Sequence, residues 1–162
     1  MDNDIKNRAA KIKLLVLDVD GVLTDGKIYL SGDNQEFKSF NVRDGSALVR
    51  GRKEGLNIAL ISGRSSSSVD RRARELGITE VYQGISDKLP VLEELMDRYS
   101  CGREETAYIG DDIADLPIFR RVGLSIAVLD AHPLVIEAAD HRTIRRGGEG
   151  AVMEIVELLL SE

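Results

Sequence analysis

Asp18 and Asp20 are two carboxylates one residue apart, and Gly21 follows them directly. The residues before them, 14–17, are only Leu and Val, which is typical of a strand buried on both faces in a parallel sheet. Ligands bind just outside the carboxyl ends of such strands. The two carboxylates are therefore expected to face a binding site, where one can act as nucleophile or metal ligand and the other can transfer protons.

Hydrogen-bond donors follow a second apolar strand, expected over residues 57–62. Ser62 carries a hydroxyl group, Gly63 offers a backbone amide that an anion can approach closely, and Arg64 carries a guanidinium group. Together these three residues form a set of donors suited to a phosphate group. The serines at 66–68 are better explained as caps of the helix that follows.

Lys88 is the first residue of a helix predicted over 88–99. A cation at this end of a helix is disfavoured by the helix dipole, so we expect an anionic neighbour that compensates it. Two interpretations remain open. Lys88 either neutralises a phosphoryl oxygen or the attacking carboxylate, or it is a solvated surface lysine.

Three more acids, Asp111, Asp112 and Asp115, come directly after a predicted strand. Oxygen ligands without clustered His or Cys favour Mg²⁺, which takes only one or two carboxylates from a protein. Asp18, Asp111 and a backbone carbonyl near Asp20 would complete such a site. The alternative for Asp112 and Asp115 is that they cap the following helix and support the site from behind.

These residues together predict phosphoryl transfer. Attack by Asp18 on a phosphoester would form an aspartyl-phosphate, with the charge balanced by Mg²⁺, Lys88 and the donors of Ser62 and Gly63. Asp20 would protonate the leaving alkoxide and then deprotonate the water that hydrolyses the intermediate.

Strands and helices alternate along the remainder of the chain. Strands are expected at 57–62, 80–82, 106–109, 125–128 and 141–144, and helices at 46–54, 69–76, 88–99, 115–122, 134–138 and 151–160. This alternation predicts an α/β fold, a Rossmann-like three-layer sandwich with a mostly parallel sheet and right-handed crossovers.

Residues 26–41 interrupt this alternation and predict a projecting β-hairpin. Its strands are expected at 28–30 and 36–40, around the turn residues 31–34. A two-stranded hairpin is marginal by itself, and its apolar side chains need a neighbouring surface. That surface is either another subunit or the same domain.

Composition limits the other possibilities. The chain has 162 residues, 43% of them hydrophobic, and a formal net charge of -6, which fits one domain and makes nucleic acid an unexpected partner. The single cysteine, Cys101, excludes an internal disulfide. His132 and His141 are isolated and are interpreted as structural. A polar amino terminus and the lack of a long apolar stretch predict a cytoplasmic protein with no membrane partner.

The motifs resemble those of the haloacid dehalogenase-like phosphatases. Motifs one to four of that superfamily correspond, in order, to Asp18-Val19-Asp20-Gly21, Ser62, Lys88 and Gly110-Asp111-Asp112. The resemblance implies a single haloacid dehalogenase-like domain over residues 1–162, of the capless subclass, with the hairpin in place of a cap domain. It also implies Mg²⁺ as the cofactor.

A narrower resemblance points to the phosphatases that act on 3-deoxy-D-manno-octulosonate 8-phosphate. It rests on DVDGVLTDG, FNVRDG, ISGR, VYQG, SDK, YIGDD, DAHP and GGEGAV. It implies hydrolysis of a sugar-acid phosphate in lipopolysaccharide precursor synthesis, by a homotetramer whose hairpins pack together. Arg64 would recognise the carboxylate of the sugar. Because the sequence ends at Glu162, soon after the last predicted helix, we expect no extended tail over a neighbouring site.

Three alternatives remain open at this point. A related nine-carbon keto-sugar acid phosphate could be the substrate, although a glutamate in place of Arg64 would be expected for it. A receiver domain also clusters acids, a hydroxyl and a lysine, but it places the acidic pair and the phosphorylated aspartate on different strands. A catalytically silent tetrameric scaffold of the same fold is the third alternative.

Overall fold

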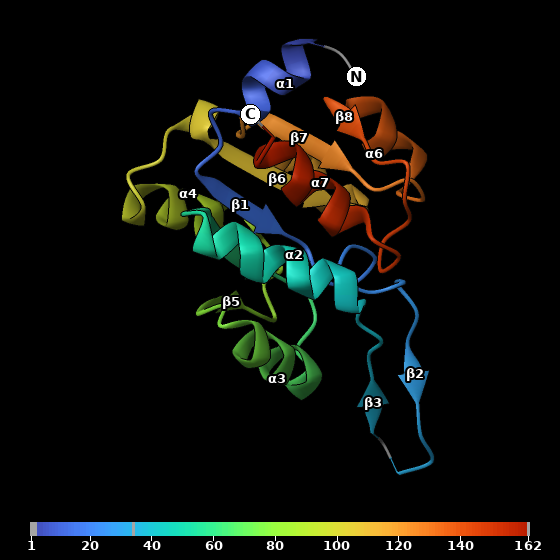
Figure 1. The fold of residues 1–162 in the computed structure, drawn as a ribbon. Helices are drawn as coiled ribbons and strands as arrows, with labels where there is room; N and C mark the ends of the chain where they lie inside the picture. Colours follow the sequence, from blue (N-terminus) through green and yellow to red (C-terminus); the bar gives the residue numbers. More distant parts are fainter. Residues whose placement is uncertain (1–2, 34, 162) are drawn as a thin grey trace.

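The computed structural model describes residues 3–33 and 35–161, so Asn34, in the predicted hairpin turn, lies outside the described residues. One parallel sheet forms the middle layer, and helices cover both of its faces (Figure 1). This is the three-layer α/β sandwich that the alternation of strands and helices predicts.

Six strands form the sheet in the order β5-β4-β1-β6-β7-β8, and each neighbouring pair is parallel. Their bounds are β1 Leu14–Leu17, β4 Asn57–Ile61, β5 Glu80–Tyr82, β6 Thr106–Gly110, β7 Leu124–Ala127 and β8 His141–Arg142. The chain extends the sheet from β1 in one direction through β4 and β5, and then in the other through β6. This reversal makes the carboxyl ends of β1, β4 and β6 the expected ligand site.

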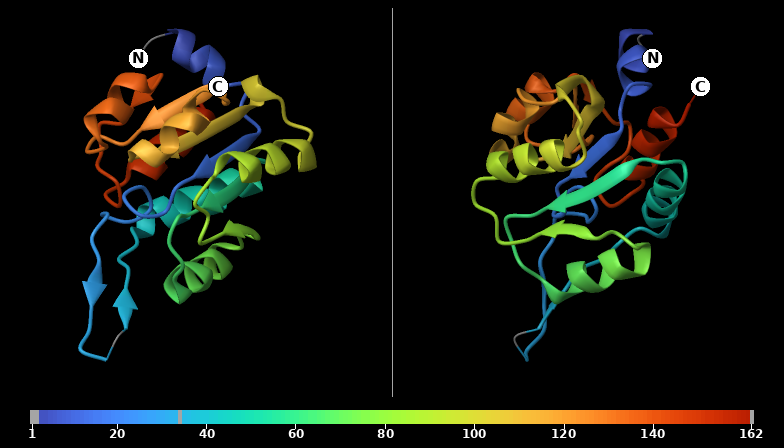
Figure 2. Two further views of the ribbon diagram at one scale, coloured as in Figure 1. Left: turned by 180° about the vertical axis from the view of Figure 1, so that it is seen from behind. Right: turned by 90° about the vertical axis from the view of Figure 1, so that its left-hand side faces the viewer.

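The described α-helices are α1 Asn3–Ala9, α2 Val42–Lys53, α3 Ser67–Leu76, α4 Leu89–Arg98, α5 Leu116–Phe119, α6 Pro133–Ala138 and α7 Ala151–Leu159. Helices α2 and α7 pack together on one face of the sheet, and α4, α5 and α6 lie on the other (Figure 2). In the described parts of the chain, no helix has both the length and the apolar character needed to cross a membrane.

Three helices differ most from the sequence prediction, and the others agree with it within two residues at each end. Helix α1 lies in the polar amino terminus, where no helix was predicted. Helix α2 begins at Val42, earlier than the predicted residue 46, because the Asn41 side chain accepts hydrogen bonds from the backbone of the first turn. Helix α5 ends at Phe119 rather than 122, and the chain turns toward Gly123, where a Cβ atom would lie 2.6 Å from the Arg103 carbonyl oxygen.

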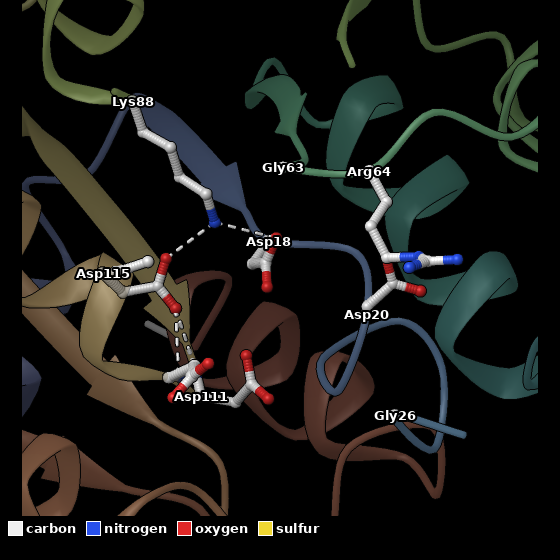
Figure 3. A pocket seen from close by; sticks show the side chains of 10 residues that line it. Asp18, Asp20, Gly26, Gly63, Arg64, Lys88, Asp111 and Asp115 are labelled. Carbon is white, nitrogen blue, oxygen red and sulfur yellow. Dashed lines mark hydrogen bonds and ion pairs between the residues drawn. The ribbon is translucent and has the colours of Figure 1, made fainter. Parts of the chain in front are cut away.

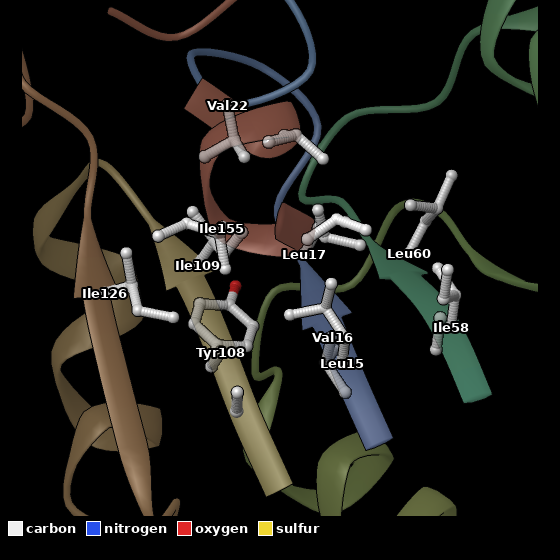
Figure 4. Close-up of a cluster of buried hydrophobic side chains, with 14 of the residues drawn as sticks. Leu15, Val16, Leu17, Val22, Ile58, Leu60, Tyr108, Ile109, Ile126 and Ile155 are labelled. Atoms are coloured by element: carbon white, nitrogen blue, oxygen red, sulfur yellow. The ribbon is translucent and has the colours of Figure 1, made fainter. Parts of the chain in front are cut away.

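The core is built around β1, whose four residues, Leu14–Leu17, are fully buried. Side chains of β4, β6 and β7 and of helix α7 pack around them (Figure 4). Burial on both faces explains why this strand is a continuous apolar run rather than an alternating one. Asp18, the next residue, is thereby held at the end of a rigid element.

The hairpin projects from the body of the molecule, as predicted (Figures 1 and 2). Its strands, β2 Tyr29–Leu30 and β3 Glu36–Phe37, pair antiparallel and are shorter than expected. Leu30 is 73% exposed and Phe37 51% exposed, and Ile28 and Tyr29 are exposed as well. Phe40 alone packs against the domain of its own chain, where the Arg72 guanidinium lies 6.0 Å from its ring centre.

Candidate active site

A cavity of about 280 Å³ lies at the carboxyl ends of the central strands. The residues that line it are Asp18, Asp20, Gly26, Gly63, Arg64, Lys88, Asp111, Asp112, Ala114 and Asp115 (Figure 3). Of the site residues that the sequence predicts, all but Ser62 are among them. Residues nearly a hundred positions apart therefore meet here because they follow parallel strands.

Asp18 and Lys88 form a buried ion pair in this cavity. The Lys88 Nζ lies 2.9 Å from Asp18 Oδ1 and 2.8 Å from Asp115 Oδ1, and Lys88 is only 6% exposed (Figure 3). Lys88 is thus not a solvated surface lysine, and two carboxylates supply the anionic neighbour expected at the start of α4. Burial alone would lower the pKa of Lys88, but both carboxylates outweigh it and raise that pKa.

Asp115 is fully buried, and both of its oxygens accept hydrogen bonds. Oδ1 accepts from Lys88 and from the hydroxyl of Tyr108 at 2.7 Å, whereas Oδ2 accepts from the backbone nitrogens of Asp111 at 3.0 Å and Asp112 at 3.2 Å. The Asp112 side chain in turn accepts from the backbone of Ile113 at 2.8 Å. Both acids therefore cap the 3₁₀ turn Ile113–Asp115, as the alternative interpretation expected, and Asp115 also positions Lys88.

The acidic cluster fits a divalent cation. Carboxylate oxygens of Asp18, Asp111 and Asp115 lie within 4.8 Å of one another. Asp111 Oδ1 is buried and has no hydrogen-bond partner among the described residues. Burial, and then the neighbouring Asp18 carboxylate, raise the pKa of Asp111, so a cation is needed to favour its charged form. The set consists only of oxygen donors, as Mg²⁺ prefers.

A tight turn after β1 brings Asp20 into the cavity. Gly21 has φ +88°, and a Cβ atom there would lie 2.0 Å from Asp111 Oδ2, so a side chain is excluded for both reasons. Thr24, which is buried, accepts hydrogen bonds through Oγ1 from the backbone nitrogens of Gly21 and Gly26, each at 3.2 Å. These contacts fix the loop that follows β1.

The hairpin of the same chain reaches this site, a contact that was not predicted from the sequence. Lys38 donates a hydrogen bond to Asp20 Oδ1 and lies 3.1 Å from Glu36 Oε1. Glu36 Oε2 accepts from Arg64 Nη2 at 2.6 Å. The signal in the sequence is the two-residue spacing of Glu36 and Lys38, which places both on the face of the hairpin opposite Phe37.

The loop after β4 holds the predicted phosphate donors. Ser62 is buried, and its Oγ accepts a hydrogen bond from the Arg64 backbone nitrogen at 3.3 Å. Gly63 and Arg64 line the cavity, so the loop presents them while Ser62 lies behind them. Ser66 caps helix α3 through a hydrogen bond from Ser68, as the capping interpretation expected.

The two histidines have structural environments. The His132 ring accepts a hydrogen bond from the Leu134 backbone at 3.2 Å and so caps helix α6. Its backbone nitrogen, however, donates to the Asp111 carbonyl oxygen at 2.7 Å, so the residue is closer to the site than the sequence indicated. His141 lies in the edge strand β8.

Comparisons with known proteins agree with this geometry. A family model described as haloacid dehalogenase-like hydrolase matches residues 77–155. The 3-deoxy-D-manno-octulosonate 8-phosphate phosphatase KdsC of Yersinia pestis is 47% identical over 158 residues, which are 98% of this chain and 84% of that protein.

Two solved structures are also similar to this chain. A crystal structure of the Yersinia pestis phosphatase has a TM-score of 0.97 at 46% identity, covering 99% of this chain and 86% of the other. The phosphatase of Moraxella catarrhalis, in complex with a magnesium ion, a phosphate ion and a KDO molecule, has a TM-score of 0.95 at 42% identity, covering 99% and 92%. The chain therefore belongs to the haloacid dehalogenase-like hydrolases, in the family of 3-deoxy-D-manno-octulosonate 8-phosphate phosphatases.

Proposed function

We propose that this chain is a Mg²⁺-dependent phosphomonoesterase that hydrolyses 3-deoxy-D-manno-octulosonate 8-phosphate to the free sugar acid and phosphate, in lipopolysaccharide precursor synthesis. The observation that supports this most directly is the buried Asp18 carboxylate in the cavity, paired with Lys88 and next to the unpartnered Asp111 oxygen. The names of the similar phosphatases supply the substrate.

Asp18 is the proposed nucleophile. Its carboxylate oxygen attacks the phosphorus atom, a phosphorus–oxygen bond forms, and the bond to the sugar oxygen breaks. Asp20 gives its proton to that leaving oxygen. Asp20 then takes a proton from the attacking water, whose oxygen displaces Asp18 from phosphorus and releases inorganic phosphate.

Three groups around Asp18 balance the charge of the transferred phosphoryl group. Asp18, Asp111 and a backbone carbonyl near Asp20 would hold Mg²⁺, which would supply positive charge to balance that of the phosphoryl group. Lys88 keeps the attacking carboxylate in place, and its ammonium is close enough to the cavity to contact a phosphoryl oxygen. Ser62 and Gly63 are the proposed hydroxyl and amide donors. Asp112 and Asp115 support the site by capping the turn that follows Asp111.

Arg64 is the proposed contact for the carboxylate of the sugar acid. Its side chain is 49% exposed and lines the cavity, so a substrate can reach the guanidinium. A guanidinium binds a carboxylate through two parallel hydrogen bonds. The residue thus favours a keto-sugar acid phosphate over simple phosphoesters.

The substrate assignment is tested by comparing the kinetics of eight-carbon keto-sugar acid phosphates, nine-carbon keto-sugar acid phosphates and simple phosphoesters. We expect the eight-carbon compound to be preferred by about tenfold or more in kcat/KM, which is about 1.4 kcal/mol. Asp18→Asn is the control and should lose more than about 10⁴-fold in turnover. Preference for the nine-carbon compound would reassign the substrate, and absence of phosphate release from every ester would favour the silent scaffold.

The active form is proposed to be a homotetramer in which the hairpins pack together. The support is the exposure of Ile28, Tyr29, Leu30 and Phe37 on a segment that projects from its own domain. Phe37→Asp should shift the mass measured by light scattering toward smaller species, because it places a charge in the apolar contact. An unchanged mass would count against this interface.

Two further parts of the proposal concern the chain as a whole. We treat residues 1–162 as a single catalytic domain with the hairpin of 26–41 as its insertion. We also place the enzyme in the cytoplasm. The supporting observation is that Cys101 is a buried free thiol, as is usual in a reducing compartment.

A further inference from the structure

The hairpin carries a buried lysine that the reaction described above does not use. The Lys38 side chain is 2% exposed, although it belongs to a projecting segment whose apolar residues are exposed. Burying an ammonium group is unfavourable unless it is paired. Its partners are Asp20, whose side chain is 24% exposed, and Glu36.

Lys38 contacts Asp20 without lining the cavity itself, whereas Asp20 does line it. The carboxylates of Asp20 and Glu36 compensate the buried charge of the Lys38 ammonium group, which donates to Asp20 and forms an ion pair with Glu36. The ammonium group is therefore a permanent hydrogen-bond donor to Asp20.

The contact is made to one particular oxygen of Asp20. Lys38 donates to Oδ1. An ammonium group can donate but not accept, so Oδ1 must stay an acceptor and a proton on this carboxyl group has to lie on Oδ2. The lysine thereby selects the oxygen that carries the transferable proton and limits rotation of the carboxyl group.

We propose that Lys38 is a positioning residue, which holds Asp20 so that Oδ2 delivers the proton to the leaving-group oxygen. Glu36 fixes Lys38 from the other side, and Arg64 in turn holds Glu36 through its Oε2. The hairpin thus contributes to proton transfer within its own subunit. This inference rests on the role of Asp20 in the proposed function.

Leaving-group dependence tests the inference. The ratio kcat/KM reports only the steps up to departure of the leaving group. An alkyl oxygen needs a proton in order to leave, whereas p-nitrophenolate leaves without one. Lys38→Met should lower kcat/KM for the sugar-acid phosphate by roughly 10²-fold, the loss typical of a misplaced catalytic group. For p-nitrophenyl phosphate it should lower kcat/KM by less than about threefold.

Matched variants separate this role from a structural one. Lys38→Arg keeps a donor to Asp20 and should recover part of the lost rate on the sugar-acid phosphate. Lys27→Met removes another lysine of the hairpin, one that contacts Asp25 instead, and should leave both substrates unaffected. Inhibition by inorganic phosphate should be unchanged in Lys38→Met. Thermal melting of each variant verifies folding.

Three results would overturn the inference. Equal losses on both substrates would show that Lys38 acts on the fold or on the attack step. A rise in the KM for both substrates and in the inhibition constant for phosphate would show direct phosphate binding. A loss that Lys38→Arg does not reduce would show that the donor is unimportant. If the sugar-acid phosphate is not hydrolysed at all, the proposed function fails, and the contrast is measured with an alkyl phosphate that the wild type does hydrolyse.

Discussion

The charges around Asp18 are balanced within a few ångströms. Asp18 and Asp115 share the Lys88 ammonium, and the Tyr108 hydroxyl donates to Asp115. Burial, the largest influence, raises the pKa of Asp18, and the Lys88 ammonium opposes that rise. A nucleophile must be ionised to attack, so the lysine contributes to reactivity as well as to stability.

Lys88→Met tests this balance in the metal-free protein. Removal of one partner of a buried ion pair typically costs about 3–5 kcal/mol, because the remaining charges are left uncompensated. We expect the free energy of unfolding, measured with urea, to fall by about that amount. Lys13→Met removes the cation of an exposed pair with Glu105 and serves as the control, with little change. A free energy of unfolding for Lys88→Met within error of that of the wild type would contradict a stabilising role of the Lys88 charge.

At the scale of elements, the turn after β1 is supported by a loop from the far end of the chain. Gly148 donates from its backbone nitrogen to the Val22 carbonyl oxygen at 2.9 Å. A Cβ atom at Gly147 would lie 1.7 Å from the Gly21 carbonyl oxygen. The two glycines therefore let the backbone before α7 lie directly against the turn that presents Asp20.

Gly147→Ala should displace this turn, because the added methyl group meets backbone that cannot rotate away. We expect kcat to fall by about tenfold or more, since small displacements of catalytic groups are costly, with destabilisation of about 1–3 kcal/mol. Steady-state kinetics and urea unfolding measure the two effects. Gly32→Ala, where the described residues place no atom within 4 Å of the added Cβ, is the control. Unchanged kcat in Gly147→Ala would show that the loop does not support the site.

At the scale of the whole molecule, the sheet separates the site from the far edge strand. The strands that supply Asp18 and Asp111, β1 and β6, are central, whereas β8 lies at the sheet edge beyond β7. His141 in β8 has a buried Nε2 atom with no hydrogen-bond partner among the described residues. Burial lowers the pKa of His141, although Glu154 opposes this.

This histidine predicts a pH dependence of stability. Between its lowered pKa and the ordinary value of about 6.5, the unfolded chain binds a proton that the folded chain does not. The contribution of His141 to the free energy of unfolding therefore falls as the pH drops below about 6.5. His141→Gln should flatten the stability profile measured by urea unfolding between about pH 5 and pH 7. A profile as steep as that of wild type would contradict the assignment.

Much of the fold and site followed from local patterns in the sequence. Apolar runs that end in Asp18, Ser62 and Asp111 indicated buried parallel strands, and strands of that kind must bring their carboxyl ends to one edge of a sheet. Lys88 was expected at the same edge because the helix that it begins follows the strand predicted at 80–82. Motif order then indicated the family, because four matching segments, each after a different strand, are far more specific than one.

The tertiary structure alone decided how the side chains pair across that edge. The contact of Lys38 with Asp20 joins the hairpin to the end of β1. No periodicity in the sequence specifies the direction in which a two-stranded hairpin projects. The same holds for Asp115, which looked like a simple cap but also binds Lys88 and Tyr108. Residue types and strand order determine which chemistry is possible. Packing between distant segments determines which buried charged groups pair with one another.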